Sequence, residues 1–194
     1  MQEDIDFFTQ AVGLRKVKQT VLFDGTAPTY HLYYANANAE IGSVMTTFPF
    51  RQAGLTGRRG SGQVQNTAFS VPAGAATFWA ECFKRMGCSD GMASERFGQK
   101  ALAFKPPAGL GFEVIEDAGD TREPWTTNDI TADVAARGFH SISMAVREAH
   151  EQEQFLIDGL GFVKVGSDGA YSRYAIAGGG AARTIELVEH PDMP

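Results

Sequence analysis

Three stretches of the chain repeat one pattern of apolar and polar positions. Each has apolar residues at helical spacing, such as Ile5, Phe8 and Val12 in the first, and each ends at a Gly. The stretches are residues 4–14, 77–87 and 153–162. Glycine commonly ends a helix because it adopts the left-handed cap conformation without steric cost. The pattern therefore predicts three amphipathic helices.

The spacing of these helices indicates an internal repeat. Gly13, Gly87 and Gly161 follow one another at intervals of 74 residues, and Asn66 and His140 are also 74 residues apart. Alternating, strand-like stretches surround the helices at residues 30–34, 43–48, 62–72, 100–104, 111–115, 138–146, 170–176 and 183–188. A repeat of this length is one supersecondary unit. We interpret it as a βαβββ module, which gives an α+β fold class.

The repeat divides the chain into unequal parts. Residues 1–60 form a partial first module lacking its first strand, since the position equivalent to Asn66 would fall before Met1. Residues 61–130 form the second module, and residues 131–194 form the third, which we expect to pair with the second. A fourth module is absent from the sequence.

Composition narrows the possible functions. The 194 residues include 17 Lys and Arg against 23 Asp and Glu, a net charge of −6, which argues against nucleic acid as a partner. No apolar stretch is long enough to span a bilayer, so no membrane partner is expected. The acidic start Met1-Gln2-Glu3-Asp4 does not resemble a signal peptide. Cys82 and Cys88 are interpreted as reduced thiols of a cytoplasmic protein.

Several short motifs resemble those of a known group of proteins. They are Asp4-Ile5-Asp6-Phe7-Phe8, Tyr30-His31-Leu32-Tyr33-Tyr34, Val44-Met45-Thr46-Thr47-Phe48-Pro49, Arg96-Phe97-Gly98-Gln99, Phe112-Glu113-Val114-Ile115-Glu116-Asp117 and Arg137-Gly138-Phe139-His140-Ser141. With these motifs the chain resembles the vicinal oxygen chelate superfamily of glyoxalases, bleomycin-resistance proteins and extradiol dioxygenases. Within it, the chain is similar to the hydroquinone ring-cleaving dioxygenases, such as the 2,6-dichlorohydroquinone 1,2-dioxygenases. The resemblance implies βαβββ modules that form an incomplete, cupped mixed β-barrel.

The resemblance also implies a cofactor and a site outside the chain. Family members hold Fe(II) with two His and one Glu, a facial triad with open positions for substrate and dioxygen. In the hydroquinone group the triad comes from the first strand of module one and from module four. These strands would precede Met1 and follow Pro194, so we assign no catalytic residue. We expect Fe(II) in the complete protein and no cofactor bound by this chain, which should be inactive alone.

Four residues occupy the superfamily's chelate positions in modules two and three. They are Asn66, Glu113, His140 and Glu186, on the first and last strands of each module. One interpretation is a divalent-metal site, because imidazole and carboxylate groups are metal ligands. The other, which we favour because Asn is a poor nitrogen donor, is a buried, hydrogen-bonded remnant of the duplication.

Three aromatic residues form a candidate substrate pocket. Tyr30, His31 and Tyr33 lie on a strand that borders the active cavity in the relatives, where they could contact an aromatic ring. The alternative is that they only pack within the sheet.

The sequence leaves two functions from different classes. The first is a non-haem Fe(II) dioxygenase that cleaves hydroquinone-type, including chlorinated, aromatic rings. The second is a metal-free protein of the glyoxalase and bleomycin-resistance type that binds small aromatic ligands. In either case the unpaired sheet edge of the partial first module favours a homo-oligomer.

Overall fold

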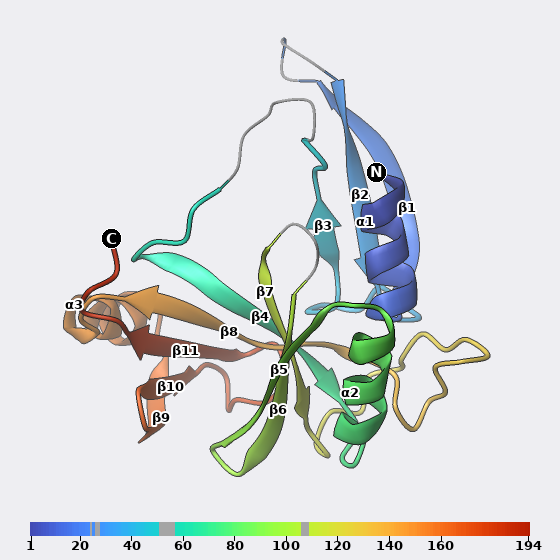
Figure 1. Ribbon diagram of the computed structural model, residues 1–194. Helices are drawn as coiled ribbons and strands as arrows, with labels where there is room; N and C mark the ends of the chain where they lie inside the picture. The colour runs from blue at the N-terminus through green and yellow to red at the C-terminus, as the bar shows by residue number, and fades with distance from the viewer. Residues whose placement is uncertain (24, 26–27, 51–56, 106–108) are drawn as a thin grey trace.

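The computed structural model describes residues 1–23, 25, 28–50, 57–105 and 109–194, with the side chains of residues 89–92 excepted. The chain begins with helix α1 (Gln2–Asp6), which continues as the π-helical turn η1 (Phe7–Ala11). Strands β1 (Arg15–Phe23), β2 (Pro28–Ala35) and β3 (Met45–Thr47) then form an antiparallel sheet in that order. Figure 1 shows this sheet standing apart from a larger curled sheet, with α1 alongside it.

The larger sheet has eight strands and forms a half-barrel, which confirms the predicted fold class. Its strands are β4 (Gln63–Val71), β5 (Ser89–Arg96), β6 (Gln99–Phe104), β7 (Gly111–Glu116), β8 (Gly138–Val146), β9 (Val163–Asp168), β10 (Tyr171–Ala175) and β11 (Thr184–Glu189). Helix α2 (Ala76–Arg85) follows β4, and α3 (His150–Gln154) with the π-helical turn η3 (Phe155–Gly159) follows β8.

The eight-stranded sheet consists of two four-stranded halves that have the same connectivity. Its strand order runs β5-β6-β7-β4-β8-β11-β10-β9, with β4 and β8 antiparallel at the centre. Strand β7 pairs parallel with β4, and β11 pairs parallel with β8. The order strand, helix, three strands therefore occurs twice, and the two copies are related by a pseudo-two-fold axis between β4 and β8.

Strands β1, β5 and β9 were not located by the sequence pattern. Most residues of β1 and β9 are exposed on both faces, so these strands lack the alternation of apolar and polar residues that marks a half-buried strand. In the structure, β1 pairs with β2 and β9 pairs with β10 through backbone hydrogen bonds, which do not depend on the pattern of side chains.

Aromatic packing joins the first sheet to the half-barrel. The ring centroid of Phe7 lies 6.0 Å from that of Phe104 and 5.9 Å from that of Phe112, while Phe8 stacks on Tyr34 at 4.8 Å. One hydrophobic core therefore contains η1, α2 and both sheets. Figure 1 shows α1 and α2 on the same side of the molecule, with α3 at the opposite end.

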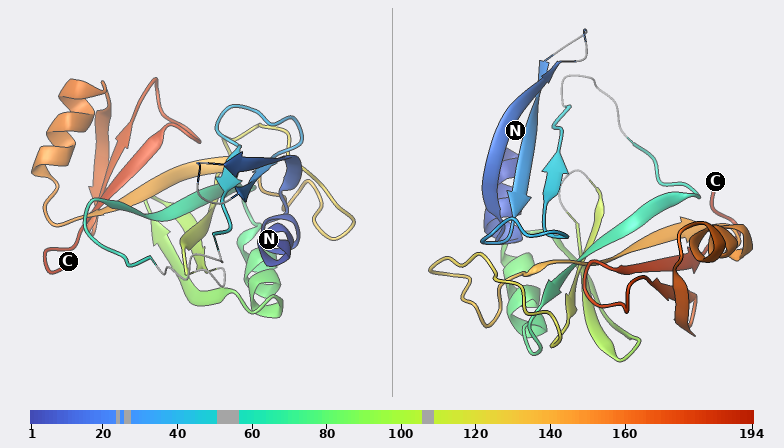
Figure 2. Two further views of the ribbon diagram at one scale, coloured as in Figure 1. Left: turned by 90° about the horizontal axis from the view of Figure 1, so that it is seen from above. Right: turned by 180° about the vertical axis from the view of Figure 1, so that it is seen from behind.

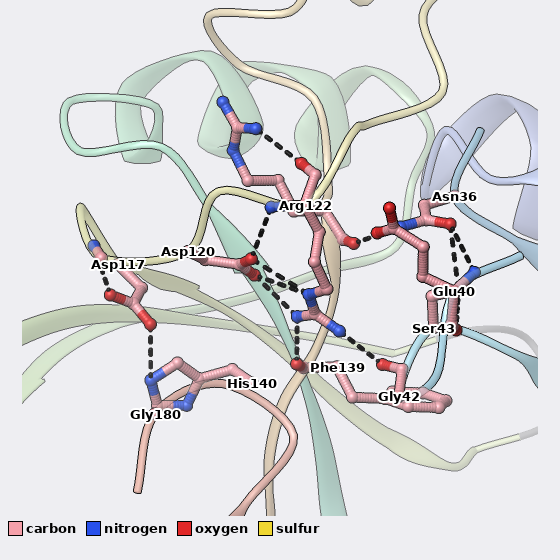
Figure 3. Close-up of polar contacts among 12 residues, drawn as sticks. Asn36, Glu40, Gly42, Ser43, Asp117, Asp120, Arg122, Phe139, His140 and Gly180 are labelled. Atoms are coloured by element: carbon pink, nitrogen blue, oxygen red, sulfur yellow. Dashed lines mark hydrogen bonds and ion pairs between the residues drawn. The ribbon is translucent and has the colours of Figure 1, made fainter. Parts of the chain in front are cut away.

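A second connection is made by Arg122, in the long segment between β7 and β8. Its Nη1 donates to the carbonyl of Gly42 at 2.8 Å and its Nη2 to the carbonyl of Phe139 at 2.6 Å, while Asp120 binds the same guanidinium (Figure 3). Gly138 has a φ of +136°, and a Cβ there would lie 2.6 Å from Arg122 Nη1. Arg122 thus fastens the loop after β2 to the start of β8, and only glycine leaves it room.

Both cysteines, Cys82 and Cys88, are free and buried. Among the described residues, no helix is long and apolar enough to cross a membrane.

Replacing Phe7 with Ala should destabilise the protein. Phe7 is 7% exposed, and truncating a buried Phe typically costs about 3–5 kcal/mol. Denaturant unfolding followed by circular dichroism measures the change. The matched control is Phe23→Ala, because Phe23 is 65% exposed and its loss should change stability by no more than about 0.5 kcal/mol. Equal effects of the two substitutions would show that η1 does not join the two sheets.

Candidate functional site

The interior of the half-barrel holds a cluster of buried polar side chains. Four neighbouring strands, β7, β4, β8 and β11, carry Glu113, Asn66, His140 and Glu186 respectively. Glu113 is 5% exposed, His140 4% and Glu186 0%, and Asn66 Nδ2 donates to Glu113 Oε1 at 3.2 Å. The structure therefore brings the four predicted residues into one interior.

Two arginines, which sequence reasoning did not assign to the site, bind the two glutamates. Arg96 Nη2 donates to Glu113 Oε2 at 2.5 Å, and Arg96 Nε donates to Glu186 Oε2 at 3.0 Å. Arg173 Nη2 donates to Glu186 Oε1 at 2.6 Å. Burial opposes the charge on Arg96, but Glu113 and Glu186 together raise its pKa above the ordinary value. Both carboxylates are consequently neutralised by guanidinium groups.

A chain of hydrogen bonds determines the protonation state of His140. Arg173 Nη1 donates to Gln99 Oε1 at 2.8 Å, which directs the amide nitrogen of Gln99 toward His140. That nitrogen lies 3.1 Å from His140 Nε2, and an amide nitrogen can only donate. His140 Nε2 must therefore accept, so Nδ1 carries the proton and lies 2.9 Å from Ser141 Oγ.

Burial also favours the neutral imidazole. It lowers the pKa of His140 from 6.5 to about 4, against the opposing effect of Asp117, whose Oδ2 lies 4.0 Å from His140 Nε2. Figure 3 shows Asp117 pointing at this ring. Arg173 and Arg96 lower the pKa further, whereas Glu186 raises it.

The same two arginines also connect the two outer hairpins of the curled sheet, β5–β6 and β9–β10. The guanidinium of Arg96 lies 4.8 Å from the ring centre of Tyr171, and that of Arg173 lies 3.9 Å from the ring centre of Phe97. The backbone N–H of Phe97 donates to Asp168 at 2.7 Å. Phe97 and Tyr171 are 74 residues apart, so the repeat itself could have pointed to these crossed contacts. The cluster thus joins β5–β6 to β9–β10.

These contacts bear on the two interpretations of the cluster. Among the described residues, no group of three or more His, Cys, Asp or Glu side chains is arranged to hold a metal ion. The carboxylate oxygens that Fe(II) or another divalent metal would need are bound by Arg96 and Arg173 instead. The donor set therefore does not fit a divalent-metal site, and it suits a buried charge network.

The predicted substrate-pocket residues do not all lie together. On strand β2, His31 and Tyr33 share one face, where the His31 ring lies 4.0 Å from the rings of both Tyr33 and Phe48. Tyr30 belongs to the opposite face, together with Tyr34, and is 41% exposed. The alternation of side chains along a strand could have separated Tyr30 from the other two.

The face that contains His31, Tyr33 and Phe48, which we call the aromatic face, also carries a positive charge. Lys18 Nζ lies 5.2 Å from the centre of the Tyr33 ring. The Tyr33 hydroxyl and His31 Nδ1 share a hydrogen bond of 2.8 Å, which fixes the imidazole against Phe48. Flat rings beside a cation form a surface that can stack on a planar, electron-rich ligand.

The depressed pKa of His140 predicts a loss of stability in mild acid. Below pH 6.5 the unfolded chain binds a proton at His140 that the folded chain does not bind until about pH 4. Stability should therefore fall as the pH drops through this window, by about 3 kcal/mol from this group. Unfolding by urea at several pH values measures the slope. His140→Gln should flatten it, whereas His150→Gln, at an exposed position on α3, should not. If both variants keep the slope of the unchanged protein, the assignment to His140 is wrong.

The charge network also predicts the metal content of the purified protein. After incubation with Fe(II), Mn(II) or Zn(II) and desalting, elemental analysis should find much less than one metal ion per chain. His140→Ala should leave that amount unchanged. One equivalent of metal that the substitution removes would instead support the metal-site interpretation.

Comparison with known proteins agrees with this architecture. No family model matches the chain. It is 40% identical over 196 aligned positions to the chlorohydroquinone/hydroquinone 1,2-dioxygenase of Sphingobium indicum, an alignment that covers all of this chain and 61% of that protein. It is 36% identical over 177 positions to MhqO of Bacillus subtilis, named as a ring-cleaving dioxygenase, covering 91% of this chain and 56% of that one. The chain thus spans about three fifths of the length of these curated relatives.

Solved structures give the same result for the fold. A crystal structure of a Bacillus subtilis protein named as a dioxygenase superposes with a TM-score of 0.87 at 34% identity, over 100% of this chain and 61% of that one. Glyoxalase I from Zea mays superposes with a TM-score of 0.67 at 16% identity, over 99% of this chain and 64% of that one, which speaks for the fold alone. The resemblance predicted from the motifs is confirmed: the curated homologues of the chain are hydroquinone ring-cleaving dioxygenases, and its fold is glyoxalase-like.

Proposed function

We propose that this chain provides the scaffold and part of the substrate surface of a dioxygenase that cleaves hydroquinone-type aromatic rings, chlorinated ones included. The observation that carries the proposal is the 40% identity to a chlorohydroquinone/hydroquinone 1,2-dioxygenase along the whole chain. Identity that extends over both sheets favours a shared activity over a shared fold alone.

The aromatic face supplies the chemistry of substrate binding in this proposal. A hydroquinone is flat, so its ring can stack against the surface made by His31, Tyr33 and Phe48. The ammonium of Lys18, held over Tyr33, places positive charge where a substrate hydroxyl loses its proton. Stacking tolerates apolar substituents such as chlorine, because these add contact area without needing a hydrogen bond.

The half-barrel acts as the rigid support of that face. Phe7 and Phe8 pack η1 against the half-barrel on one side and against Tyr34 of β2 on the other. A shift of β2 would therefore disturb the core that both sheets share.

In this proposal, none of the described side chains is assigned as an iron ligand. Fe(II) is the cofactor implied by the resemblance, and when bound it supplies the activation of dioxygen. The described residues do not fit it, since Glu113 and Glu186 are bound by arginine and His140 by Gln99. The 194-residue chain alone should therefore show no oxygen uptake.

A chimaera tests the proposed activity. This chain would replace the matching segment of the Sphingobium indicum relative, leaving the rest of that protein unchanged. The folded chimaera, supplied with Fe(II) and hydroquinone, should consume oxygen at an electrode and give a ring-opened product by mass spectrometry. A folded, iron-loaded chimaera that binds hydroquinone without oxygen uptake would favour the metal-free binding function instead.

Within that chimaera, the aromatic face predicts a specific loss. His31→Ala should lower kcat/KM for hydroquinone by roughly 2- to 10-fold, because one aromatic contact contributes about 0.5–1.5 kcal/mol. Tyr30→Ala is the matched control, since Tyr30 lies on the opposite face of the same strand, and it should leave kcat/KM unchanged. Equal effects at both positions would remove the aromatic face from the substrate site.

A further inference from the structure

One nitrogen atom of the aromatic face is left without a hydrogen bond. His31 Nδ1 shares a hydrogen bond of 2.8 Å with the Tyr33 hydroxyl. His31 Nε2 is buried and has no hydrogen-bond partner among the residues that the structure describes. Buried polar atoms of native proteins are nearly always hydrogen-bonded, so an orphaned imidazole nitrogen indicates a place where a ligand supplies the bond.

The third module shows which way the side chains of β2 face. Strands β2 and β10 are each the middle strand of three, and both end in Tyr-Ala, at Tyr34 and Tyr174. Tyr34 stacks on Phe8. Tyr174 packs in a cluster with Leu156, which lies 148 residues after Phe8, twice the repeat length. The two tyrosines are therefore equivalent, and each packs on the helical segment of its own module.

The residues before these tyrosines face the other way, because side chains alternate along a strand. By this equivalence Tyr33 corresponds to Arg173. His31, two positions earlier, corresponds to Tyr171. Arg173 binds Glu186 in the interior of the half-barrel, and Tyr171 faces the same interior. His31 and Tyr33 therefore lie on the side of the first sheet away from η1, at positions that face the interior in the third module.

The first and third modules differ in what pairs the polar groups at these positions. Glu186 lies opposite Arg173 across β10 and β11, and the two form an ion pair. Thr46 lies opposite Tyr33 across β2 and β3, so the first module has no carboxylate at the equivalent position. The first module thus combines flat rings with one unpaired nitrogen. A polar atom on a mostly apolar surface is what orients a small ligand.

The chemistry of this nitrogen favours a hydroxyl group as its partner. The Tyr33 hydroxyl either donates to His31 Nδ1 or accepts from it, so Nε2 is correspondingly a donor or an acceptor. A ligand hydroxyl can donate and accept, so it pairs with Nε2 in both tautomers. An ether or carbonyl oxygen can only accept, and so pairs with one tautomer alone.

We propose that His31 Nε2 hydrogen-bonds a hydroxyl group of the ligand and so makes the aromatic face selective for hydroxyl-bearing aromatic rings. Tyr33 holds the imidazole through Nδ1, and Phe48 stacks on it at 4.0 Å. This selectivity rests on the proposed function, because it names the group of a hydroquinone-type substrate that the same face recognises.

NMR of the 194-residue chain, with nitrogen-15 in its histidines, tests the contact at the atom itself. Hydroquinone, kept reduced without air, should shift the Nε2 resonance of His31, which His31→Phe identifies. The resonances of His150 should not move, because Figure 2 shows α3 at the opposite end of the molecule from β1 and β2. The probe 1,4-dimethoxybenzene, which has no hydroxyl, should shift His31 much less. Equal shifts with both probes, or no shift with either, would overturn the proposal.

A second measurement uses the chimaera described above without iron, so that no metal contributes to binding. By calorimetry, His31→Phe keeps an aromatic ring but removes the nitrogen, and should weaken hydroquinone binding by roughly 2- to 10-fold. Binding of 1,4-dimethoxybenzene should not change. Tyr30→Phe removes a hydroxyl from the opposite face of the same strand and should change neither affinity.

Equal losses for the two probes would make His31 a stacking contact only and contradict the proposal. Oxygen uptake by the iron-loaded chimaera is a separate readout. Failure of the proposed activity and failure of hydroxyl recognition are therefore distinguishable.

Discussion

The ion pairs of Arg96 are the constraint on which the half-barrel depends. Glu113 and Glu186 occupy last strands of the two repeats, and the fold turns both into one interior, where Glu186 is fully buried. Two carboxylates in a buried interior repel one another and lose their hydration, and both effects disfavour their charged forms. Arg96 reaches both and so converts a destabilising pair into a network that spans the pseudo-two-fold axis. Breaking a buried pair by removing one partner is costly, which makes this network a determinant of the sheet's closed shape.

The network is asymmetric although the repeats are related. Gln99 and Arg173 are 74 residues apart and bind each other, while the position equivalent to Arg96 is Ala170. Arg96 of the second module therefore binds both glutamates, and the third module supplies the other cation, Arg173, from a strand that is not equivalent to β5. Exact symmetry would place two identical side chains on the axis, where they would compete for the same space. Because the residues at equivalent positions differ, the side chains can fill the interior and also satisfy one another's hydrogen bonds.

The helices and most strands could be predicted from the sequence because burial leaves a periodic signal. Strands β1 and β9 left none, since their residues are exposed on both faces. At the site, Asn66, Glu113, His140 and Glu186 were predicted because the resemblance places the superfamily's chelate positions there. Arg96 was not, because its role depends on how far its side chain reaches across the barrel, and no spacing in the chain encodes that distance. The choice between a metal and a guanidinium as the partner of the carboxylates likewise required the three-dimensional structure.

The repeat also explains why the molecule is unevenly packed. The core shared by η1, α2 and both sheets is rich in aromatic rings, whereas the third repeat buries only a small cluster around Leu156 and Tyr174. The difference does not lie in the helical sequences, since η1 and η3 both begin with Phe followed by an apolar residue. The difference in burial comes from the residues that pack against each turn. Phe7 of η1 packs against Phe104 and Phe112 of the half-barrel, whereas Phe155, at the equivalent position of η3, is 63% exposed.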